Sequence, residues 1–342
     1  MAHRIVTFGE LLLRLSPPGR ERFFQSDRLQ ARFGGGEANV AVSLARFGRE
    51  TSFLTVLPDN PVAEAGIAEL RRHGIDTGGI IRRGRRMGIY FAETGSGPRP
   101  STVLYDRDGS AISEAGPGDI DWARAFAGAS WFHVTGITPA LSRSAADLTQ
   151  EGMIAAKAAG LTVSLDLNYR AKLWRYGVPA AEVMPTLAAR ADLLLANEED
   201  CQKALGLKCS PGGDGAFDLK AYEKLTADVL AAYPNLARAA VTLRTSRSAD
   251  RNGWSAVLRS RAGFLAGPSH EIENIVDRVG AGDAFAAGLI HGLLAFEDDA
   301  RALTFAVAAS CLKHTVAGDF NLVSEREVLD LVAGDASGRI RR

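Results

Sequence analysis

Cysteine is scarce in this sequence, with three residues among 342. Cys201, Cys209 and Cys311 are odd in number and lack the paired spacing of a metal site. This pattern argues against a secreted disulfide framework. It fits reduced, structural thiols in a cytoplasmic enzyme better.

Net charge is also absent, because 40 lysines and arginines balance 40 aspartates and glutamates. A chain without a basic or acidic excess is a poor partner for nucleic acid or for an anionic membrane. Long hydrophobic runs are missing too. The run ending at Phe8 is too short for a signal peptide, and the run over 284–296 contains His291 and glycines. We therefore expect small molecules as binding partners, with no nucleic acid and no membrane.

The composition is that of a globular protein, with 46% hydrophobic and 23% charged residues. A chain of this length can bury a sizeable core, as one large α/β domain or as a core with an appendage. No internal repeat, low-complexity tract or linker divides it into independent domains.

Strands and helices alternate regularly from residue 131 onward. Continuous apolar runs typical of buried parallel strands cover 131–135, 162–166, 193–196 and 239–243, and helical patterns over 142–159 and 221–233 intervene. Earlier in the chain, 4–8 and 51–57 are expected as strands and 61–73 as a helix. The sequence therefore predicts an α/β fold with a mainly parallel central sheet and helices on both faces.

Two segments interrupt this pattern with short, partly alternating strands. Strand-like pieces at 11–16, 22–25 and 29–33 form the first segment, and pieces at 88–93 and 102–105 form the second. We expect the two segments to join into one small sheet over the core, a lid. An exposed sheet with apolar alternation can pair between subunits, so a homo-oligomer assembled through the lid is expected.

These patterns divide the chain into a core, a lid and a tail. The predicted α/β core comprises 1–10, 34–85 and 113–336, the predicted β lid comprises 11–33 and 86–112, and residues 337–342 are predicted as a flexible basic tail. Residues 208–215 are predicted as a surface loop.

The stretch from Asp277 to Asp283 runs directly into a small, apolar helical segment. The glycines at 280 and 282 allow a sharp turn, so that unpaired amides converge at the first turn of the helix and form an anion hole for phosphate. A carboxylate beside a phosphate site repels the ligand unless it has a chemical role there. Asp283 is therefore a candidate general base that accepts a proton from an attacking hydroxyl. The alternative is an ordinary helix cap after a glycine turn.

A second glycine cluster, Gly34-Gly35-Gly36, opens an amphipathic helix that ends at Gly48. Glycines at this position allow the backbone to approach a ligand closely, although a plain loop and cap gives the same pattern.

Polar clusters follow the predicted core strands at their carboxyl ends. They are Thr135-Gly136, Asp166 to Arg170, Asn197 to Asp200, and Thr242 to Arg244. In parallel α/β sheets, ligands bind beyond these ends. We therefore expect the binding site at this edge of the sheet.

With these pieces in place, the chain resembles the ribokinase-like (PfkB) family of carbohydrate kinases over nearly its whole length. Two signatures carry the resemblance, Gly34 to Asn39 and Asp277 to Asp283. Within the family it is most similar to the 2-keto-3-deoxygluconate kinases. The segments that carry this finer similarity are Arg14 to Gly19, Leu104 to Arg107, Asp166 to Arg170, and Lys313 to Thr315 with Gly318 to Asn321.

The resemblance implies a three-layer ribokinase-like sandwich with a small β lid. It also implies ATP-dependent phosphorylation of the terminal hydroxyl of 2-keto-3-deoxygluconate, giving 2-keto-3-deoxy-6-phosphogluconate. Asp283 would be the base, and the backbone amides of Gly280, Ala281 and Gly282 would stabilise the transferring phosphoryl group.

The other site residues that the resemblance implies fall into three sets. Substrate would contact Gly35, Gly36, Asn39, Tyr90, Tyr105, Arg107, Arg170 and Asp319. ATP would contact Asn168, Arg170, Asn197, Thr242, Arg244, Gly280 and Gly282. Mg²⁺ would be bound through water by Asn197 and Asp200, and a monovalent cation such as K⁺ is a further candidate ligand.

The substrate carboxylate needs a cationic partner, and a guanidinium can bind both of its oxygens. Arg107 on the lid and Arg170 at a core strand end are the candidates, with Arg170 also able to reach phosphate. Tyr90 and Tyr105 would donate phenolic hydroxyls. The alternative for a lone Arg or Tyr on an exposed sheet is a solvated or packing residue. Glu10 contacts substrate or ends a strand.

Three positions depart from the family pattern. Arg278 stands where the family commonly has Thr, and Asp200 stands where it usually has Glu, with Glu199 as an alternative metal ligand. The segment 242–246 lacks the glycines that many relatives carry in the nucleotide loop. Asn197 also sits where a helix N-cap would, so capping and metal binding are both open for it.

Other functions fit the sequence less well. The nearest alternative is another kinase of the same family, acting on fructose, ribose or a different keto sugar. A dinucleotide-dependent oxidoreductase is disfavoured, because the glycines at 34–36 follow lid-type strands and lack the Gly-x-Gly-x-x-Gly spacing. A sugar-binding regulator without activity is disfavoured by the intact Asp283 and glycine turn.

Overall fold

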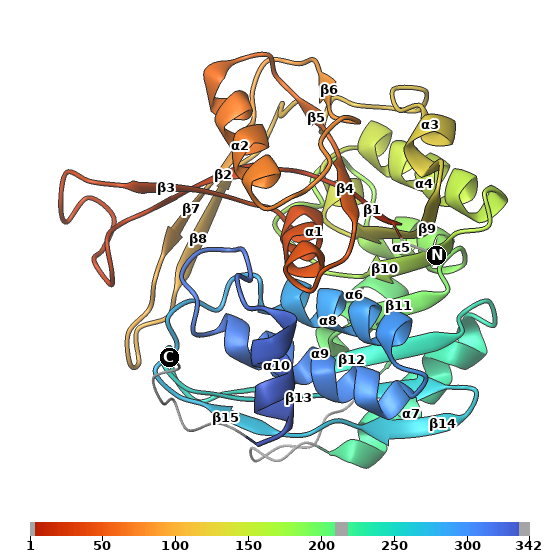
Figure 1. The fold of residues 1–342 in the computed structure, drawn as a ribbon. Coiled ribbons are helices and arrows are strands. Elements are labelled where there is room, and N and C mark those ends of the chain that lie inside the picture. Colours follow the sequence, from red (N-terminus) through yellow and green to blue (C-terminus); the bar gives the residue numbers. More distant parts are fainter. Residues whose placement is uncertain (1–3, 209–217, 335–342) are drawn as a thin grey trace.

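The computed structural model describes residues 4–208 and 218–334 as three layers, a central sheet between two layers of helices (Figure 1). Within these residues the central sheet has nine strands, in the order β14-β13-β12-β11-β10-β9-β1-β4, with β15 paired to β13. All pairs from β4 to β12 are parallel, and the pairs made by β13 are antiparallel. The predicted fold class is confirmed.

The central strands form where the sequence has continuous apolar runs. Their bounds are β1 Arg4–Phe8, β4 Thr51–Leu54, β9 Ala129–Thr135, β10 Thr162–Asp166, β11 Leu193–Ala196, β12 Arg238–Ser246, β13 Asn252–Ser260, β14 Gly263–Ala266 and β15 His270–Ile272. Strand β11 is buried along its whole length, as expected for a strand covered on both faces.

Helices cover both faces of this sheet. One face packs against α1 (Gly36–Arg46), α8 (Ala281–Ala295) and α9 (Asp299–Lys313), with α10 (Glu325–Val332) on α9. The other packs against α3 (Trp122–Phe126), α4 (Arg143–Ala158), α5 (Ala180–Ala188), α6 (Glu198–Leu205) and α7 (Leu219–Ala232). Helix α2 (Pro61–Arg72) packs in a separate apolar cluster, and η1 (Thr138–Ala140) is a single 3₁₀ turn.

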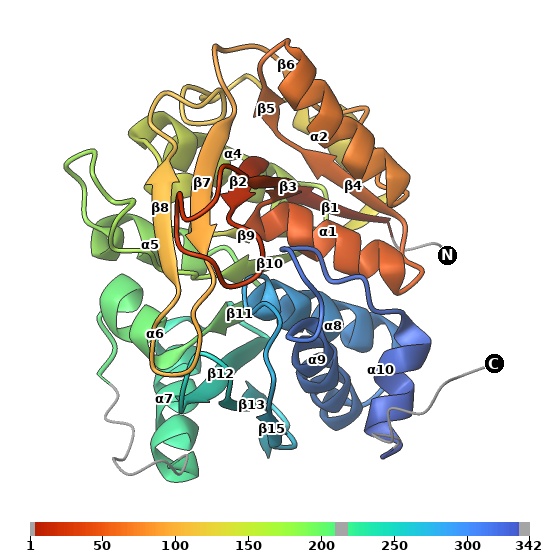
Figure 2. The same cartoon turned by 90° about the vertical axis from the view of Figure 1, so that its left-hand side faces the viewer.

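A separate small sheet forms from the two interrupting segments (Figure 2). Its order is β3-β2-β7-β8, with β2 Leu12–Ser16, β3 Gln30–Gly34, β7 Gly88–Glu93 and β8 Thr102–Asp106. A short parallel pair joins β5 (Val56–Leu57) and β6 (Ile81–Arg82). The predicted strand piece at 22–25 is wrong. These residues form a turn, with Phe24 81% exposed and at a φ of 61°.

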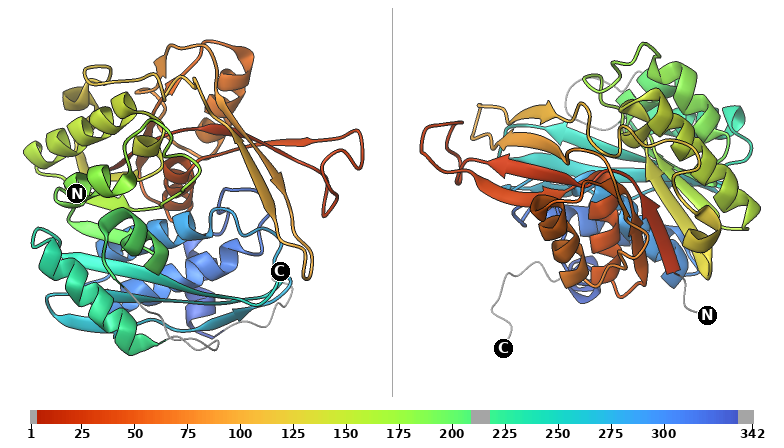
Figure 3. Two further views of the ribbon diagram at one scale, coloured as in Figure 1. Left: turned by 180° about the vertical axis from the view of Figure 1, so that it is seen from behind. Right: turned by 90° about the horizontal axis from the view of Figure 1, so that it is seen from above.

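The small sheet projects from one side of the body and is tied to the core at its base and at its tip (Figure 3). At the base, Arg14 of β2 bonds Asp277 and Asp319 of the core, at 2.8 Å each. At the tip, Asp250 accepts a hydrogen bond from the Gly97 amide at 2.7 Å and pairs with Arg20 at 2.7 Å. The sheet is therefore held over the carboxyl edge of the core.

Some predictions lie outside the described residues, namely the tail 337–342, Cys209 and most of the 208–215 loop. Within 4–208 and 218–334, no helix combines the length and the apolar character needed to cross a membrane.

Candidate active site

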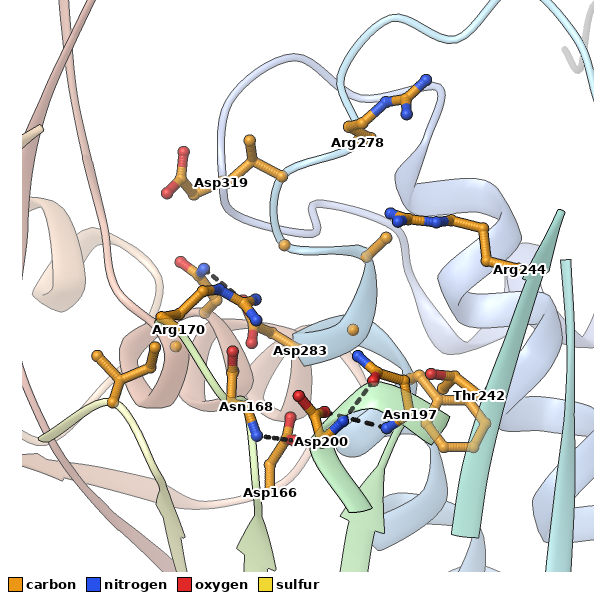
Figure 4. A pocket seen from close by; sticks show the side chains of 18 of the residues that line it. Asp166, Asn168, Arg170, Asn197, Asp200, Thr242, Arg244, Arg278, Asp283 and Asp319 are labelled. Atoms are coloured by element: carbon orange, nitrogen blue, oxygen red, sulfur yellow. Dashed lines mark hydrogen bonds between the residues drawn. The ribbon is translucent and has the colours of Figure 1, made fainter. Parts of the chain in front are cut away.

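A cavity of about 620 Å³ lies where the carboxyl ends of the parallel strands meet the small sheet. Its wall includes Asp166 at the end of β10 and Ala196 at the end of β11. Leu12, Tyr90 and Tyr105 of the small sheet complete the wall on the other side. Figure 4 shows Asp283 between a strand-end group, Asp166, Asn168 and Asp200, and the loop that carries Asp319.

Asp283 lies in the first turn of α8, lines the cavity and is 8% exposed. Its Oδ2 accepts a hydrogen bond from the Asn39 amide at 2.7 Å. No side chain caps α8, whose N-cap is Gly280, so the alternative of Asp283 as an ordinary cap is wrong. Burial raises the pKa of Asp283 to about 6, although the Asn39 hydrogen bond lowers it.

The turn before α8 has the conformation that its glycines allow. Gly280 adopts a left-handed φ of 83°, and a Cβ there would lie 2.1 Å from the backbone oxygen of Asp319. A Cβ on Gly282 would meet no heavy atom of the described chain within 4 Å. The first amides of a helix lack intrahelical acceptors. Among the amides at this turn, that of Ala281 donates a 3.3 Å hydrogen bond to the backbone oxygen of Arg278. The turn therefore has the form of an anion-binding helix start.

Helix α1 brings the other glycine cluster to the same place. Its N-cap is Gly35, where a Cβ would lie 2.0 Å from the Glu10 backbone oxygen, and a Cβ on Gly36 would lie 3.7 Å from Asp283 Oδ1. Asn39 accepts the Gly35 amide at 3.2 Å while it donates to Asp283. Asn39 lines the cavity as predicted, but its amide holds the candidate base. The side-chain oxygen and one N–H of Asn39 are therefore already used within the protein.

Asn197 and Asp200 form a capping box at the start of α6. The Asn197 side chain accepts the Asp200 amide at 2.8 Å, and Asp200 Oδ2 accepts the Asn197 amide at 3.0 Å. Asp200 Oδ1 accepts the Tyr169 amide at 2.9 Å. Both carboxylate oxygens therefore accept backbone amides, and the predicted cap at Asn197 is confirmed. The contact of Asn197 and Asp200 to Mg²⁺ through water stays a prediction. Burial raises the pKa of Asp200 to about 6.

Other strand-end groups also offer oxygen ligands to a magnesium ion. The Oδ1 atom of Asn168 is buried without a hydrogen-bond partner in the described chain, at a residue with a left-handed φ of 39°. Asp166 and Glu199 line the same cavity, and burial raises the pKa of Asp166 well above its ordinary value. Mg²⁺ typically binds one or two carboxylates together with substrate phosphates and water. Asn168, Asp166 and Glu199 are therefore the residues that could hold it.

Three arginines reach the core side of the cavity. Arg170 is exposed, lies beside Asp283 in Figure 4, and lowers the pKa of both Asp283 and Asp166. Arg244 is also exposed, with Thr242 partly buried on the same strand. Arg278 donates to the backbone oxygens of Ser248 and Ala249, at 3.1 and 2.7 Å. The core side therefore offers positive charge to a polyphosphate.

On the lid side, the charged candidates already have protein partners. Arg107 is 5% exposed, and its Nε donates to Glu10 at 2.6 Å while Nη2 pairs with the same carboxylate oxygen. Asp319 accepts from Arg14 at 2.8 Å and from the Tyr90 hydroxyl at 2.5 Å. The Arg107 guanidinium lies over the Tyr105 ring, 5.5 Å from its centroid. Arg107, Tyr90, Tyr105 and Asp319 all line the cavity. Buried ion pairs and hydrogen bonds orient Arg107, Tyr90 and Asp319, whereas Tyr105 is 36% exposed.

Sequence reasoning left out two buried residues that build the site. Arg14 links β2 to the loop that carries Asp277. The sequence feature that could have identified it is a single charged residue among leucines, on the same buried face of the strand as Leu12. Glu37 accepts the Thr135 amide at 3.0 Å and its hydroxyl at 2.8 Å, joining α1 to β9. Burial raises the pKa of Glu37 to about 7.

Comparisons with known proteins identify relatives of this chain. The model of the pfkB family of carbohydrate kinases matches residues 2–325. A 2-dehydro-3-deoxygalactonokinase of Haloferax volcanii is 34% identical, covering 99% of both chains. A 2-dehydro-3-deoxygluconokinase of Bacillus subtilis is 28% identical over 95% of this chain and 93% of that one. The crystal structure of 2-dehydro-3-deoxygluconokinase from Thermotoga maritima superposes with a TM-score of 0.91, at 44% identity over 98% of this chain and 99% of the other.

Proposed function

The chain belongs to the pfkB family of carbohydrate kinases, and from that premise we propose that its sugar substrate is 2-keto-3-deoxygluconate. ATP phosphorylates the terminal hydroxyl, and the product is 2-keto-3-deoxy-6-phosphogluconate. One observation carries the proposal, a buried carboxylate, Asp283, facing the cavity at the Gly280–Gly282 turn. The likeness to the Thermotoga maritima enzyme supports the choice of sugar acid.

Asp283 takes the proton from the terminal hydroxyl. The sugar oxygen forms a bond to the γ-phosphorus of ATP as the bond from that phosphorus to the β,γ-bridging oxygen breaks, and ADP leaves with the electron pair. With its pKa raised to about 6, Asp283 is mostly ionised at pH 7 and is a better proton acceptor than an exposed aspartate. Asn39 holds the carboxylate in place through the 2.7 Å hydrogen bond.

The Gly280–Gly282 turn and Arg170 stabilise the charge on the transferring group. Backbone amides at a helix start favour negative charge without reorganisation, and Arg170 adds a guanidinium beside Asp283. Asn168, Asp166 and Glu199 would hold Mg²⁺, which supplies neutralisation of the phosphate oxygens when bound. Thr242, Arg244 and Asn197 lie on the same side of the cavity and remain candidates for contacts to ATP.

The lid side recognises the sugar acid. The Glu10 pair uses Nε and Nη2 of Arg107, and the substrate carboxylate meets the guanidinium at its remaining edge. Tyr105 and Tyr90 contact the carbon chain and its hydroxyls, with Tyr90 fixed by Asp319. A neutral sugar lacks the group that this arginine recognises, so a sugar acid is preferred over fructose or ribose.

The test is a substrate panel with a coupled ADP readout. It compares 2-keto-3-deoxygluconate, the galactonate epimer that the Haloferax volcanii relative is named for, fructose and ribose. The proposal expects the highest kcat/KM on 2-keto-3-deoxygluconate. A preference for the epimer would keep the specificity for sugar acids but assign a different substrate. A preference for a neutral sugar would overturn the acid specificity.

The proposed enzyme acts in the cytoplasm, and two copies associate through their small sheets. Support for association comes from the edge strand β8, where Leu104 is 52% exposed. Apolar side chains on an edge strand favour pairing with another chain. Scattering or gel filtration of wild type and Leu104→Lys distinguishes a dimer through this face from a monomer.

A further inference from the structure

A buried lysine lies beneath the glycine turn of the site. Lys313 ends α9, and its side chain is 0% exposed. Its Nζ donates to the backbone oxygen of Val316 at 3.0 Å and to that of Asp277 at 3.3 Å. A Cβ built on Gly280 would lie 3.3 Å from Lys313 Cε, so the lysine packs directly against the turn.

Lys313 balances the charge of this buried region. The carboxylates of Asp277 and Asp319 face Arg14, whose Nη1 lies 2.8 Å from an oxygen of each. One arginine neutralises one of these two charges, and the Lys313 ammonium supplies the second positive charge. Burial lowers the pKa of Lys313, while Asp277 and Asp319 raise it.

Asp277 also fixes the shape of the turn. Asp277 Oδ1 accepts the Val279 amide at 3.0 Å, and Oδ2 accepts the Gly318 amide at 3.1 Å. The Asp277 carboxylate therefore binds the backbone amides of Val279 and Gly318, and its backbone oxygen binds Lys313 Nζ. Together these contacts fix residues 277–280. Lys313 does not belong to the cavity wall formed by the described residues, so its influence on a phosphate passes through this turn.

Backbone oxygens beside carboxylates are also the ligands that a monovalent ion such as K⁺ takes in proteins. A buried ammonium without such partners would be strongly destabilising, and here it has two oxygens and two nearby acids. We propose that Lys313 supplies, from within the chain, the cation that holds the Asp277–Gly280 turn in its anion-binding form, so that catalysis needs no added monovalent ion. Lys313 is then a positioning residue for the proposed kinase reaction, on which this inference rests.

The experiment compares wild type, Lys313→Met and a control, Lys157→Met, in choline buffer with and without K⁺ or NH₄⁺. Lys157 pairs with Asp192 at the surface, far from the turn in sequence, and its loss removes the same charge. We expect wild type and control to change by less than about two-fold with either ion. Lys313→Met should lose about 10²-fold in kcat, the cost of a misplaced catalytic group. K⁺ or NH₄⁺ should restore about ten-fold of that loss, whereas Li⁺, a smaller and more strongly hydrated ion, should not.

Three results overturn the proposal. They are a wild type activated several-fold by K⁺, a folded Lys313→Met with unchanged kcat, and a folded Lys313→Met that no cation rescues. If Lys313→Met does not fold, the ion response of the wild type decides alone. If wild type phosphorylates no sugar acid in any buffer, the proposed function fails instead. In that case, a rise in the melting temperature of Lys313→Met with K⁺, absent in wild type, still tests the cation role.

Discussion

The two ends of the cavity hold their polar groups in different ways. At the core end, Gly280, Gly282 and Asp283 form the start of α8, and a Cβ added to Gly282 would meet no described atom within 4 Å beyond its chain neighbours and its own helix backbone. At the lid end, Arg107 is bound by Glu10, and Asp319 by Arg14 and Tyr90.

This difference separates chemistry from recognition. Backbone amides and one buried carboxylate are rigid and identical for every substrate, as phosphoryl transfer requires. Ion pairs among side chains have to share their donors with the substrate, so their geometry decides which sugar fits. Substitutions at the core end should therefore lower kcat, and substitutions at the lid end should change KM and substrate preference.

The largest effect is expected for Asp283→Asn. The amide keeps the shape of the side chain but cannot accept the proton, so kcat should fall by about 10²–10⁴-fold or more. ATP binding, measured by calorimetry, should change little. Turnover near that of wild type would reject Asp283 as the base.

A pair of glycine variants sharpens the role of the turn. Gly280→Ala forces a left-handed residue against the Asp319 backbone, so both stability and kcat should fall, the latter by about 10²–10³-fold. Gly282→Ala has room in the fold and alanine favours helix, so its melting temperature should hold while the methyl group obstructs the phosphoryl position. Full activity of Gly282→Ala would show that the phosphate binds elsewhere.

At the lid end, Arg107→Ala should raise KM for the sugar acid by about 10–100-fold, the value of a charge-assisted hydrogen bond. KM for fructose should change much less. Arg86→Ala is the matched control, because Arg86 pairs with Asp106 at the surface of the same sheet. Removal of Arg107 alone leaves the Glu10 carboxylate buried without its cationic partner, which destabilises the fold. The double variant Glu10→Gln with Arg107→Met removes both charges and is the comparison that separates folding from recognition. Equal changes for acid and neutral sugars would argue against the carboxylate contact.

The smallest effect is a pH-dependent change in stability. The folded pKa of Asp283, about 6, exceeds its ordinary value of 3.8, so the folded protein binds the extra proton and loses stability as pH rises between these values. Above pH 6 the charged, buried carboxylate costs about 2–3 kcal/mol. Asp283→Asn should therefore melt higher than wild type at pH 8, by about 3–6 °C. The two should converge near pH 4, and a constant difference across this range would contradict the burial effect.

The core could be predicted from the sequence because its signals are local. Continuous apolar runs gave β10 and β11 with correct bounds, and the glycine turn correctly predicted the start of α8. Asp283 faces the cavity for the same reason, since its direction follows from the helix that it opens.

The lid end could not be predicted in the same way because its partners are distant in sequence. Arg14 and Asp319 are 305 positions apart, and Glu10 and Arg107 are 97 apart. A pattern search sees Arg107 as an available cation, whereas the fold places an acid beside it. The 22–25 segment failed for a local reason: its two phenylalanines favour a strand, but Phe24 is exposed in a left-handed turn.

The hydrogen bond from Asn39 to Asp283 joins residues 244 positions apart. During synthesis, the ribosome delivers Asn39 long before its partner exists. Until α8 is made, α1 lacks both this hydrogen-bond acceptor and the apolar surface of α8 against which Val40 and Leu44 pack. A nascent chain stopped before α8 has neither the acid nor the glycine turn, and it cannot consume ATP before its fold is complete.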